Sequence, residues 1–146
     1  MVECRGRVLA DGTAYGKLLT LDAPISFWGG VDPNTGDIID PRHPNCGESL
    51  SGRVLAVERT IGSSSSSAIL LELLRVRRAP AAILMGRADA ILSLGVIVGR
   101  ELGYETIPML EISADDFDAL PRSGTAWIEI GGVIRCESGK EEDASN

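Results

Sequence analysis

Two hydrophobic patterns divide the chain, and in its second half they alternate in a fixed order. Short apolar runs typical of strands cover residues 53–58, 81–85 and 106–112. Between them, apolar positions recur at helical spacing over residues 66–78 and 90–102. The order strand, helix, strand, helix, strand predicts parallel strands that share one sheet layer.

The patterns in the first quarter and at the end of the chain predict β-structure only, and a short helix precedes the last two strands. The expected elements are strands at residues 3–9, 16–21, 125–130 and 133–136, and a helix that begins at Ser113 or Asp115 and ends at Leu120. We therefore predict a mixed α/β fold, in which a β barrel or sandwich element wraps around an α/β core. Residues 1–137 are expected to form one domain, and the charged residues 138–146 a frayed tail.

The two longer helices have recognisable ends. Pro80 is expected to stop the first, while Asp89 caps the second and Gly103 ends it. Gly95 and Gly99 lie four residues apart, and therefore on one face of the second helix. There they would permit close packing against the sheet, so we interpret them as structural.

The most distinctive segment is Gly62 followed by five serines, residues 63–67. It connects a predicted strand to a predicted helix, an arrangement that presents backbone N–H groups and hydroxyls to an anion. The positive end of the helix dipole would also favour an alkoxide, so Ser63 or Ser64 could accept a proton. The alternative is a flexible loop with a serine helix cap. Nothing local ties the one histidine, His43, to these serines.

A second segment, residues 27–32, places Phe27 and Trp28 before a pair of glycines. Glycines allow the backbone to approach another group closely. The segment is either a buried turn anchored by its aromatic side chains, or a wall of a substrate site or a partner surface. The sequence leaves both interpretations open.

Composition narrows the classes of function. The chain has 44% hydrophobic and 24% charged residues, as globular proteins do, and its net charge of −7 gives nucleic-acid binding no electrostatic support. No apolar run is long enough to span a membrane, and the first residues lack a signal core, which predicts a cytoplasmic location. Cys4, Cys46 and Cys136 lack the spacing of a disulfide framework or a metal site.

Several of these segments, in this order, resemble the small subunit of aconitase X. The resemblance covers roughly residues 6–111, and its motifs are residues 24–33 (PISFWGGVDP), 43–44 (HP), 47–52 (GESLSG), 62–65 (GSSS) and 79–83 (APAAI). It implies an aconitase-like swivelling β/β/α barrel domain that pairs with a separate large subunit. That subunit is implied to carry an iron–sulfur cluster, so this chain itself would hold no metal.

The resemblance also implies an activity, the dehydration of a small hydroxy acid. One branch of the family converts cis-3-hydroxy-L-proline to Δ1-pyrroline-2-carboxylate, and another dehydrates (R)-5-phosphomevalonate in the mevalonate pathway. By its position after the glycine of the aconitase turn, Ser63 is implied to be the catalytic base. Gly62, Ser64 and Ser65 would line the substrate beside it.

The sequence departs from the aconitase pattern at Ser65, where aconitases have arginine. Recognition of the substrate carboxylate would then come from the partner subunit or from backbone N–H groups. Residues 62–74 contain no cation, and Arg59 is the nearest along the chain. This favours hydroxyproline over a phosphorylated substrate, as does the Arg- and Ala-rich, Lys-poor composition. A non-catalytic anion-binding swivel module is the alternative from another class of function.

Overall fold

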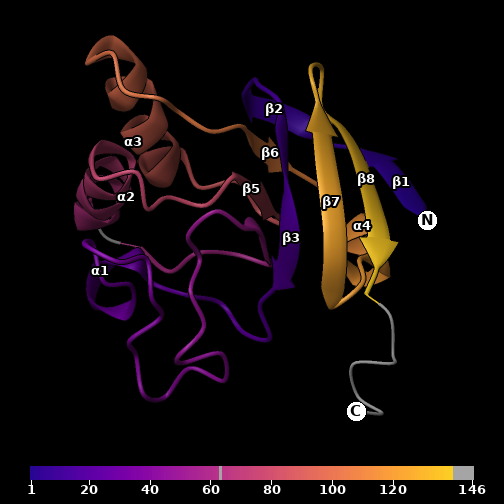
Figure 1. The fold of residues 1–146 in the computed structure, drawn as a ribbon, viewed down its shortest axis with the longest axis horizontal. Helices are drawn as coiled ribbons and strands as arrows, with labels where there is room; N and C mark the ends of the chain where they lie inside the picture. Colours follow the sequence, from indigo (N-terminus) through magenta and orange to yellow (C-terminus); the bar gives the residue numbers. More distant parts are fainter. Residues whose placement is uncertain (63, 140–146) are drawn as a thin grey trace.

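One sheet of eight strands, within the described part of the chain, curls into a nearly closed barrel (Figure 1). The computed structural model describes residues 1–62 and 64–139. The strands are β1 (Val2–Arg5), β2 (Arg7–Ala10), β3 (Ala14–Thr20), β4 (Val54–Val57), β5 (Ala82–Met85), β6 (Met109–Glu111), β7 (Ser123–Glu129) and β8 (Val133–Ser138). The helices are α1 (Phe27–Gly30), α2 (Ser65–Arg75), α3 (Ala90–Glu101) and α4 (Ala114–Ala119). The predicted mixed α/β barrel is confirmed.

The barrel closes because one run of chain joins its two edges. The strand order across the sheet is β1-β8-β7-β3-β4-β5-β6-β2, so β1 and β2 lie at opposite ends of it. Gly6 alone separates these two strands, and its N–H donates to the carbonyl of Gly132 at 2.8 Å. A Cβ at Gly6 would stand 3.0 Å from the Cβ of Leu110, so the crossing leaves little room for a side chain. The strand predicted at residues 3–9 is therefore two strands.

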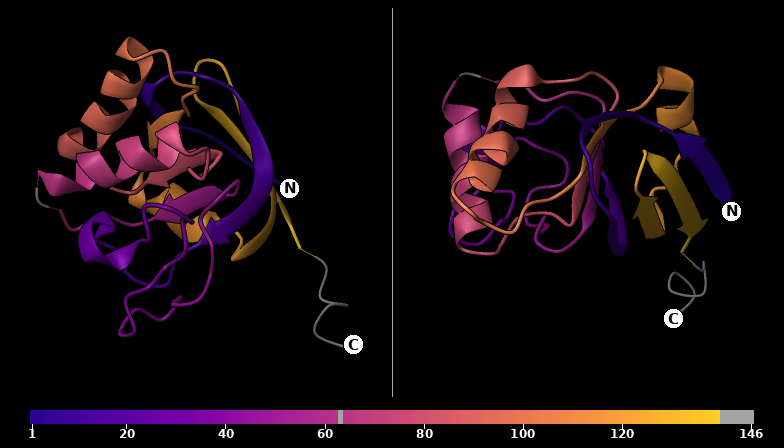
Figure 2. Two further views of the ribbon diagram at one scale, coloured as in Figure 1. Left: turned by 60° about the vertical axis from the view of Figure 1, so that its left-hand side comes forward. Right: turned by 90° about the horizontal axis from the view of Figure 1, so that it is seen from above.

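Four parallel strands, β3, β4, β5 and β6, make up the part of the sheet that lies beneath the helices α2 and α3. Every residue of β4 and β5 is buried, as expected where both faces of a parallel sheet are covered. One face of these strands lines the barrel interior, together with Ala126 and Ile128 of β7 and Ile134 of β8. Phe117 of α4 and Leu120, which follows that helix, pack against the same cluster. The other face lies against α2 and α3, on the opposite side from α4 (Figure 2). Within the described residues, none of the helices has the length and apolar character needed to cross a membrane.

The ends of α2 and β8 differ from those predicted. α2 ends at Arg75 rather than Arg78, because Arg77 adopts a φ of 61° in the left-handed region and breaks the helix before the proline is reached. β8 extends to Ser138, which the sequence places in the tail. Residues 140–146 of that predicted tail lie outside the described residues.

Gly95 and Gly99 pack α3 against α2, and not against the sheet as predicted. A Cβ on Gly95 would stand 2.8 Å from the carbonyl oxygen of Ser67, a backbone atom of α2. A Cβ on Gly99 would stand 3.1 Å from Cδ1 of Leu74, the end of a flexible side chain. The two glycines therefore set the distance between the helices, and Gly95 does so at the first turn of α2.

This difference between rigid and movable neighbours predicts that alanine at the two positions affects stability by different amounts. We expect Gly95→Ala to lower the free energy of unfolding by about 1–3 kcal/mol, because the methyl group meets backbone that cannot move aside. We expect Gly99→Ala to change it by less than about 1 kcal/mol, because the helix propensity of alanine offsets a small shift of Leu74. Urea unfolding followed by circular dichroism measures both. Equal losses would contradict this account of the packing.

Candidate functional site

Gly62 and the serines after it, which we term the Gly-Ser turn, follow the carboxyl end of strand β4. The carboxyl ends of parallel strands are the edge at which ligands bind in open α/β sheets. Residues 58–64 connect β4 to α2, and residues 86–89 connect β5 to α3. Because β4 and β5 are parallel neighbours, the two connections lie side by side. Both helices therefore begin at the same edge (Figure 1).

The aromatic segment lies directly beside this turn. The N–H of Ile61 donates to the carbonyl of Ile25 at 2.8 Å, and Ile25 forms an isolated parallel bridge with Thr60. Phe27 is fully buried in the core below α2, whereas Trp28 is 59% exposed. Phe27 therefore fits the interpretation as a buried anchor of the turn, and Trp28 fits the interpretation as part of a surface.

The predicted site residues occupy the first turn of α2 and the loop before it. Ser63 lies outside the described residues. Gly62 is exposed, and Ser64 stands at the N-cap position without a capping hydrogen bond from its side chain. Its carbonyl accepts the hydroxyl of Ser67 at 2.9 Å. Ser65 is the first helical residue and is half-buried.

A carboxylate that the sequence identifies only as a helix cap also ties the two loops together. Oδ1 of Asp89 accepts the N–H groups of Ile91 at 2.9 Å and Leu92 at 3.0 Å, which confirms the predicted cap of α3. Its Oδ2 accepts the hydroxyl of Thr60 at 2.6 Å. The start of α3 and the Gly-Ser turn are therefore held in one position relative to each other.

A cavity of about 380 Å³ opens between these loops. Its lining consists of Arg59, Thr60, Gly62, Arg87, Ala88, Asp89, Ala90 and Ile91. Neither arginine has an ion-pair or hydrogen-bond partner among the described residues, whereas the Asp89 carboxylate is engaged by Thr60 and by the N-terminus of α3. The Asp89 carboxylate already caps α3, so the two arginines and the N-terminus of α2 are the features of this cavity that favour an anionic ligand.

Sequence reasoning missed Arg87, because it follows β5 and lies far from the serines along the chain. The loop of Arg87 is held by a hydrogen bond to Glu111 and by a close backbone contact at Gly86. Oε2 of Glu111 accepts the N–H of Ala88 at 2.7 Å, and its Oε1 accepts the Nε–H of Arg7 at 2.9 Å. These two hydrogen bonds, the backbone one first, hold the pKa of Glu111 below its ordinary value. At Gly86, a Cβ would stand 2.9 Å from the carbonyl oxygen of Glu58, so the two loops touch through their backbones.

One buried hydroxyl near the turn has no hydrogen-bond partner. Ser66 is 1% exposed, and its Oγ is the one buried side-chain oxygen or nitrogen of the described residues that lacks a partner. This Oγ lies 3.3 Å from the position of a Cβ on Gly62, and Oδ2 of Asp89 lies 3.4 Å from the same point. The side of Gly62 that carries no side chain is therefore lined by a hydroxyl and a carboxylate.

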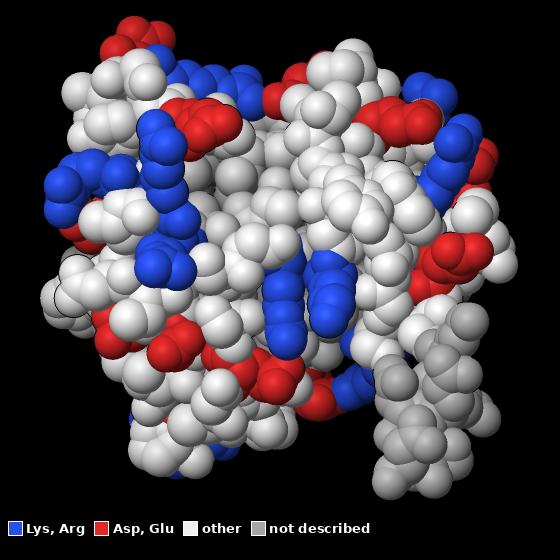
Figure 3. Space-filling model, in the orientation of Figure 1, with Lys and Arg blue, Asp and Glu red and all other residues white. Residues whose placement is uncertain are grey.

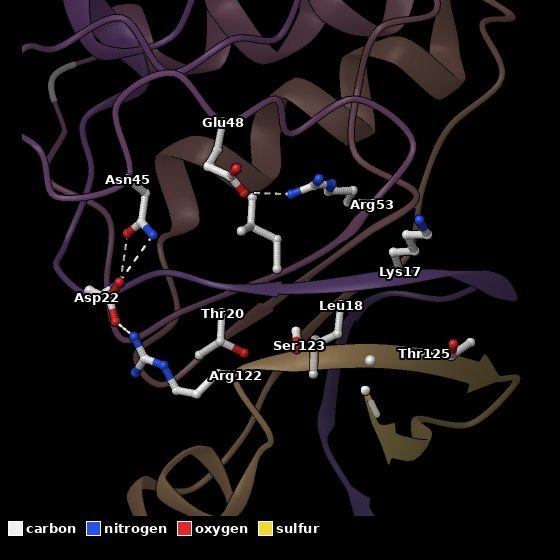
Figure 4. Close-up of a pocket in the computed structure, with 13 residues that line it drawn as sticks. Lys17, Leu18, Thr20, Asp22, Asn45, Glu48, Arg53, Arg122, Ser123 and Thr125 are labelled. Carbon is white, nitrogen blue, oxygen red and sulfur yellow. Dashed lines mark hydrogen bonds and ion pairs between the residues drawn. The ribbon is translucent and has the colours of Figure 1, made fainter. Parts of the chain in front are cut away.

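A larger cavity, of about 540 Å³, contains none of the predicted site residues (Figure 4). Most of its charged groups pair with one another. Arg53 and Glu48 are 2.8 Å apart, and Arg122 pairs with Asp22, whose carboxylate also accepts a hydrogen bond from Asn45. On the face of the molecule seen in Figure 3, basic and acidic side chains are interspersed rather than gathered by sign. We therefore regard the smaller cavity as the candidate site.

The cysteines do not fit an iron–sulfur cluster. Cys4 lies in β1, Cys136 is buried in the barrel interior, and Cys46 is exposed in the loop before β4. Burial raises the pKa of the Cys4 thiol to about 11 and also raises that of Cys136, which disfavours the thiolate that a metal requires. His43 is buried, and both its ring nitrogens have backbone partners, at Ala23 and Asn45. Among the described residues, no group of three or more potential ligands could hold a metal ion.

Comparisons with known proteins agree with this architecture. The family model for the aconitase X swivel domain matches residues 3–135. In the solved structures, the holo form of aconitase X from Thermococcus kodakaraensis superimposes with a TM-score of 0.83 at 28% identity, over 94% of this chain and 100% of that one.

Curated relatives carry two different names. The cis-3-hydroxy-L-proline dehydratases of Hypocrea jecorina and Pseudomonas aeruginosa are 40% and 48% identical, over 92% and 70% of this chain. The chain spans only 23% and 18% of their lengths. The phosphomevalonate dehydratase small subunit of Thermococcus onnurineus is 39% identical over 75% of this chain and 80% of its own length. The fold, the motifs and these matches together establish that the chain belongs to the aconitase X swivel domain family.

Proposed function

We propose that this chain is the small subunit of a two-subunit dehydratase, which removes water from cis-3-hydroxy-L-proline to give Δ1-pyrroline-2-carboxylate. The observation that carries the proposal is the cavity beside the Gly-Ser turn, where two arginines that have no ion-pair partner among the described residues lie at the N-terminus of α2. A hydroxy-acid carboxylate is an anion of the kind that such a site binds. Membership in the aconitase X family supports dehydration as the reaction.

Ser63 is the proposed base. The proton to be removed lies on the carbon next to the substrate carboxylate, and it is only weakly acidic. The N-terminus of α2 and the cations Arg59 and Arg87 favour a negatively charged oxygen at the turn, which lowers the cost of using a serine. Gly62, Ser64 and Ser65 complete the substrate side of the turn in this proposal.

The elimination balances without a redox partner. The base takes the proton, the electron pair of the C–H bond forms a carbon–carbon double bond, and the hydroxyl leaves from the neighbouring carbon. The departing hydroxyl and the proton that the base took together make up the one water released, so the base ends in its starting form. The resulting enamine then tautomerises to the cyclic imine. Arg59 and Arg87 would hold the carboxylate while negative charge builds up on it, which replaces the arginine that the turn lacks at Ser65.

The iron–sulfur cluster of the proposed enzyme belongs to a partner subunit, because the described cysteines of this chain are scattered over a strand, a loop and the barrel interior. The large-subunit partner is itself part of the proposal, supported by relatives that are named small subunits. The three free thiols support a cytoplasmic location, since that compartment keeps cysteines reduced.

(R)-5-phosphomevalonate is the second candidate substrate. Arg87 favours it, because a phosphate gains more than a carboxylate from a second cation at the cavity. The hydroxyproline proposal has its support in the two dehydratases that are 40% and 48% identical, against 39% for the phosphomevalonate relative. Both substrates carry a carboxylate next to the proton that is removed, so the proposed roles of Ser63 and the arginines apply to either.

The substrate is tested by assembling the chain with its large subunit and measuring kcat/KM for both compounds. We expect the complex to favour cis-3-hydroxy-L-proline by more than about tenfold, and the chain alone to be inactive. A preference for (R)-5-phosphomevalonate would establish the second candidate. A complex that forms but turns over neither compound would favour the non-catalytic anion-binding module.

The base is tested by Ser63→Ala in the assembled enzyme. We expect kcat to fall by about 10²–10⁴, because the proton then has no positioned acceptor. Ser67→Ala is the matched control from the same serine run, since its hydroxyl is bonded to the carbonyl of Ser64. Turnover of Ser63→Ala within about tenfold of wild type, with assembly intact, would rule out the role of base.

The arginines are tested by Arg87→Gln, which removes one cation and keeps a side chain of similar length. We expect KM to rise by about 10–100-fold, the equivalent of one charge-assisted hydrogen bond to the substrate. Arg42→Gln, in an exposed loop away from the cavity, should leave KM unchanged. An unaltered KM for Arg87→Gln would assign carboxylate binding to the partner subunit instead.

A further inference from the structure

α3 is apolar on both of its faces, which is unusual for a helix at a protein surface. Its inner face buries Leu92, Val96 and the two glycines against α2 and the core. Its outer face exposes five large apolar side chains, on the helix or directly after it: Ile91, Leu94, Ile97, Val98 and Leu102. A helix that is hydrophobic all round is normally buried on all sides. The outer face, which we term the α3 strip, therefore has the composition of a covered surface.

The neighbouring helix shows what an uncovered face looks like in the same fold. α2 turns Glu72 and Arg75 toward solvent, and the guanidinium of Arg75 lies 2.5–3.1 Å from the carboxylate oxygens of Glu72. On α3, by contrast, the charged residues are confined to its last turn, at Arg100 and Glu101. The apolar strip is thus a property of α3 alone, and not of the helical layer as a whole.

The strip is continuous with the rim of the candidate site. Ile91, its first residue, lines the cavity and is 40% exposed. Trp28 and Ile61 are exposed on the other side of the turn, where the aromatic segment pairs with residues 60–61. Seven of the twelve large apolar side chains that the described residues expose therefore lie on the strip or at the turn. A surface this rich in apolar groups marks an interaction site.

The occupant follows from the location of the strip. A cavity bounded on one side by the chain and open on the other needs a second body to exclude water from the reaction. In the two hydroxyproline dehydratase relatives, the matching segment is 23% and 18% of a longer chain, so a much larger body accompanies it there. We propose that the α3 strip, together with Trp28 and Ile61, is the surface on which the large subunit docks. This inference rests on the proposed function, which supplies that partner.

The test replaces Leu94, which is 51% exposed at the middle of the strip, with a charge of either sign. The wild type, Leu94→Lys and Leu94→Glu are each titrated with the large subunit by isothermal calorimetry. We expect both variants to bind more than about tenfold more weakly, because either charge must be desolvated at the interface. Ile130→Lys and Ile130→Glu, at a 64% exposed residue of the β7–β8 hairpin, are the matched controls and should bind normally.

Each outcome decides between the alternatives. If the wild type binds the large subunit and the Leu94 variants bind it equally well, the proposed docking surface is wrong and the proposed function still stands. Failure of the wild type to bind any large subunit would overturn both. Light scattering of the chain alone tests for self-association. If the wild type self-associates and the Leu94 variants do not, the α3 strip binds a second copy of the chain instead. Circular dichroism establishes that the variants are folded, and Ile97→Lys repeats the test at a neighbouring exposed residue.

Discussion

The structure depends on the parallel alignment of β4 with β5, whose residues are all buried. A strand that is apolar on both faces must be covered on both sides, and the chain does this with a barrel on one face and two helices on the other. Parallel strands also need crossover connections, and those after β4 and β5 return through α2 and α3, so both loops at this edge lead to a helix N-terminus. The candidate site is therefore a consequence of how the sheet is covered.

The sequence predicts those features that depend on neighbouring residues. The alternation of strands and helices, the Asp89 cap and the glycine turn of the last hairpin all follow from local patterns, and the structure confirms them. The family resemblance, carried by long motifs, is confirmed as well. The role of Ser63 remains a prediction, since that residue lies outside the described part of the chain.

What the sequence could not predict depends on contacts between distant segments. Arg87 reaches the Gly-Ser turn only because β5 lies beside β4. Gly95 faces α2 rather than the sheet, because the direction of a helix face is set by tertiary packing and not by the spacing of two glycines. The division of one predicted strand at Gly6 requires both sheet edges to be known. In each case the missing information was the identity of the neighbour.

The way in which the barrel closes has a consequence for the order of folding. The unit from β4 to β6, which carries the candidate site, joins segments that are close along the chain, so its contacts can form early. Closure must wait for residues 2–5 to find residues 133–136, a search over nearly the whole described length. Until then, the edges of β6 and β8 have unpaired backbone groups, which are open to pairing with another chain. The period of greatest risk of aggregation therefore comes after the unit that carries the candidate site has formed and before the barrel closes.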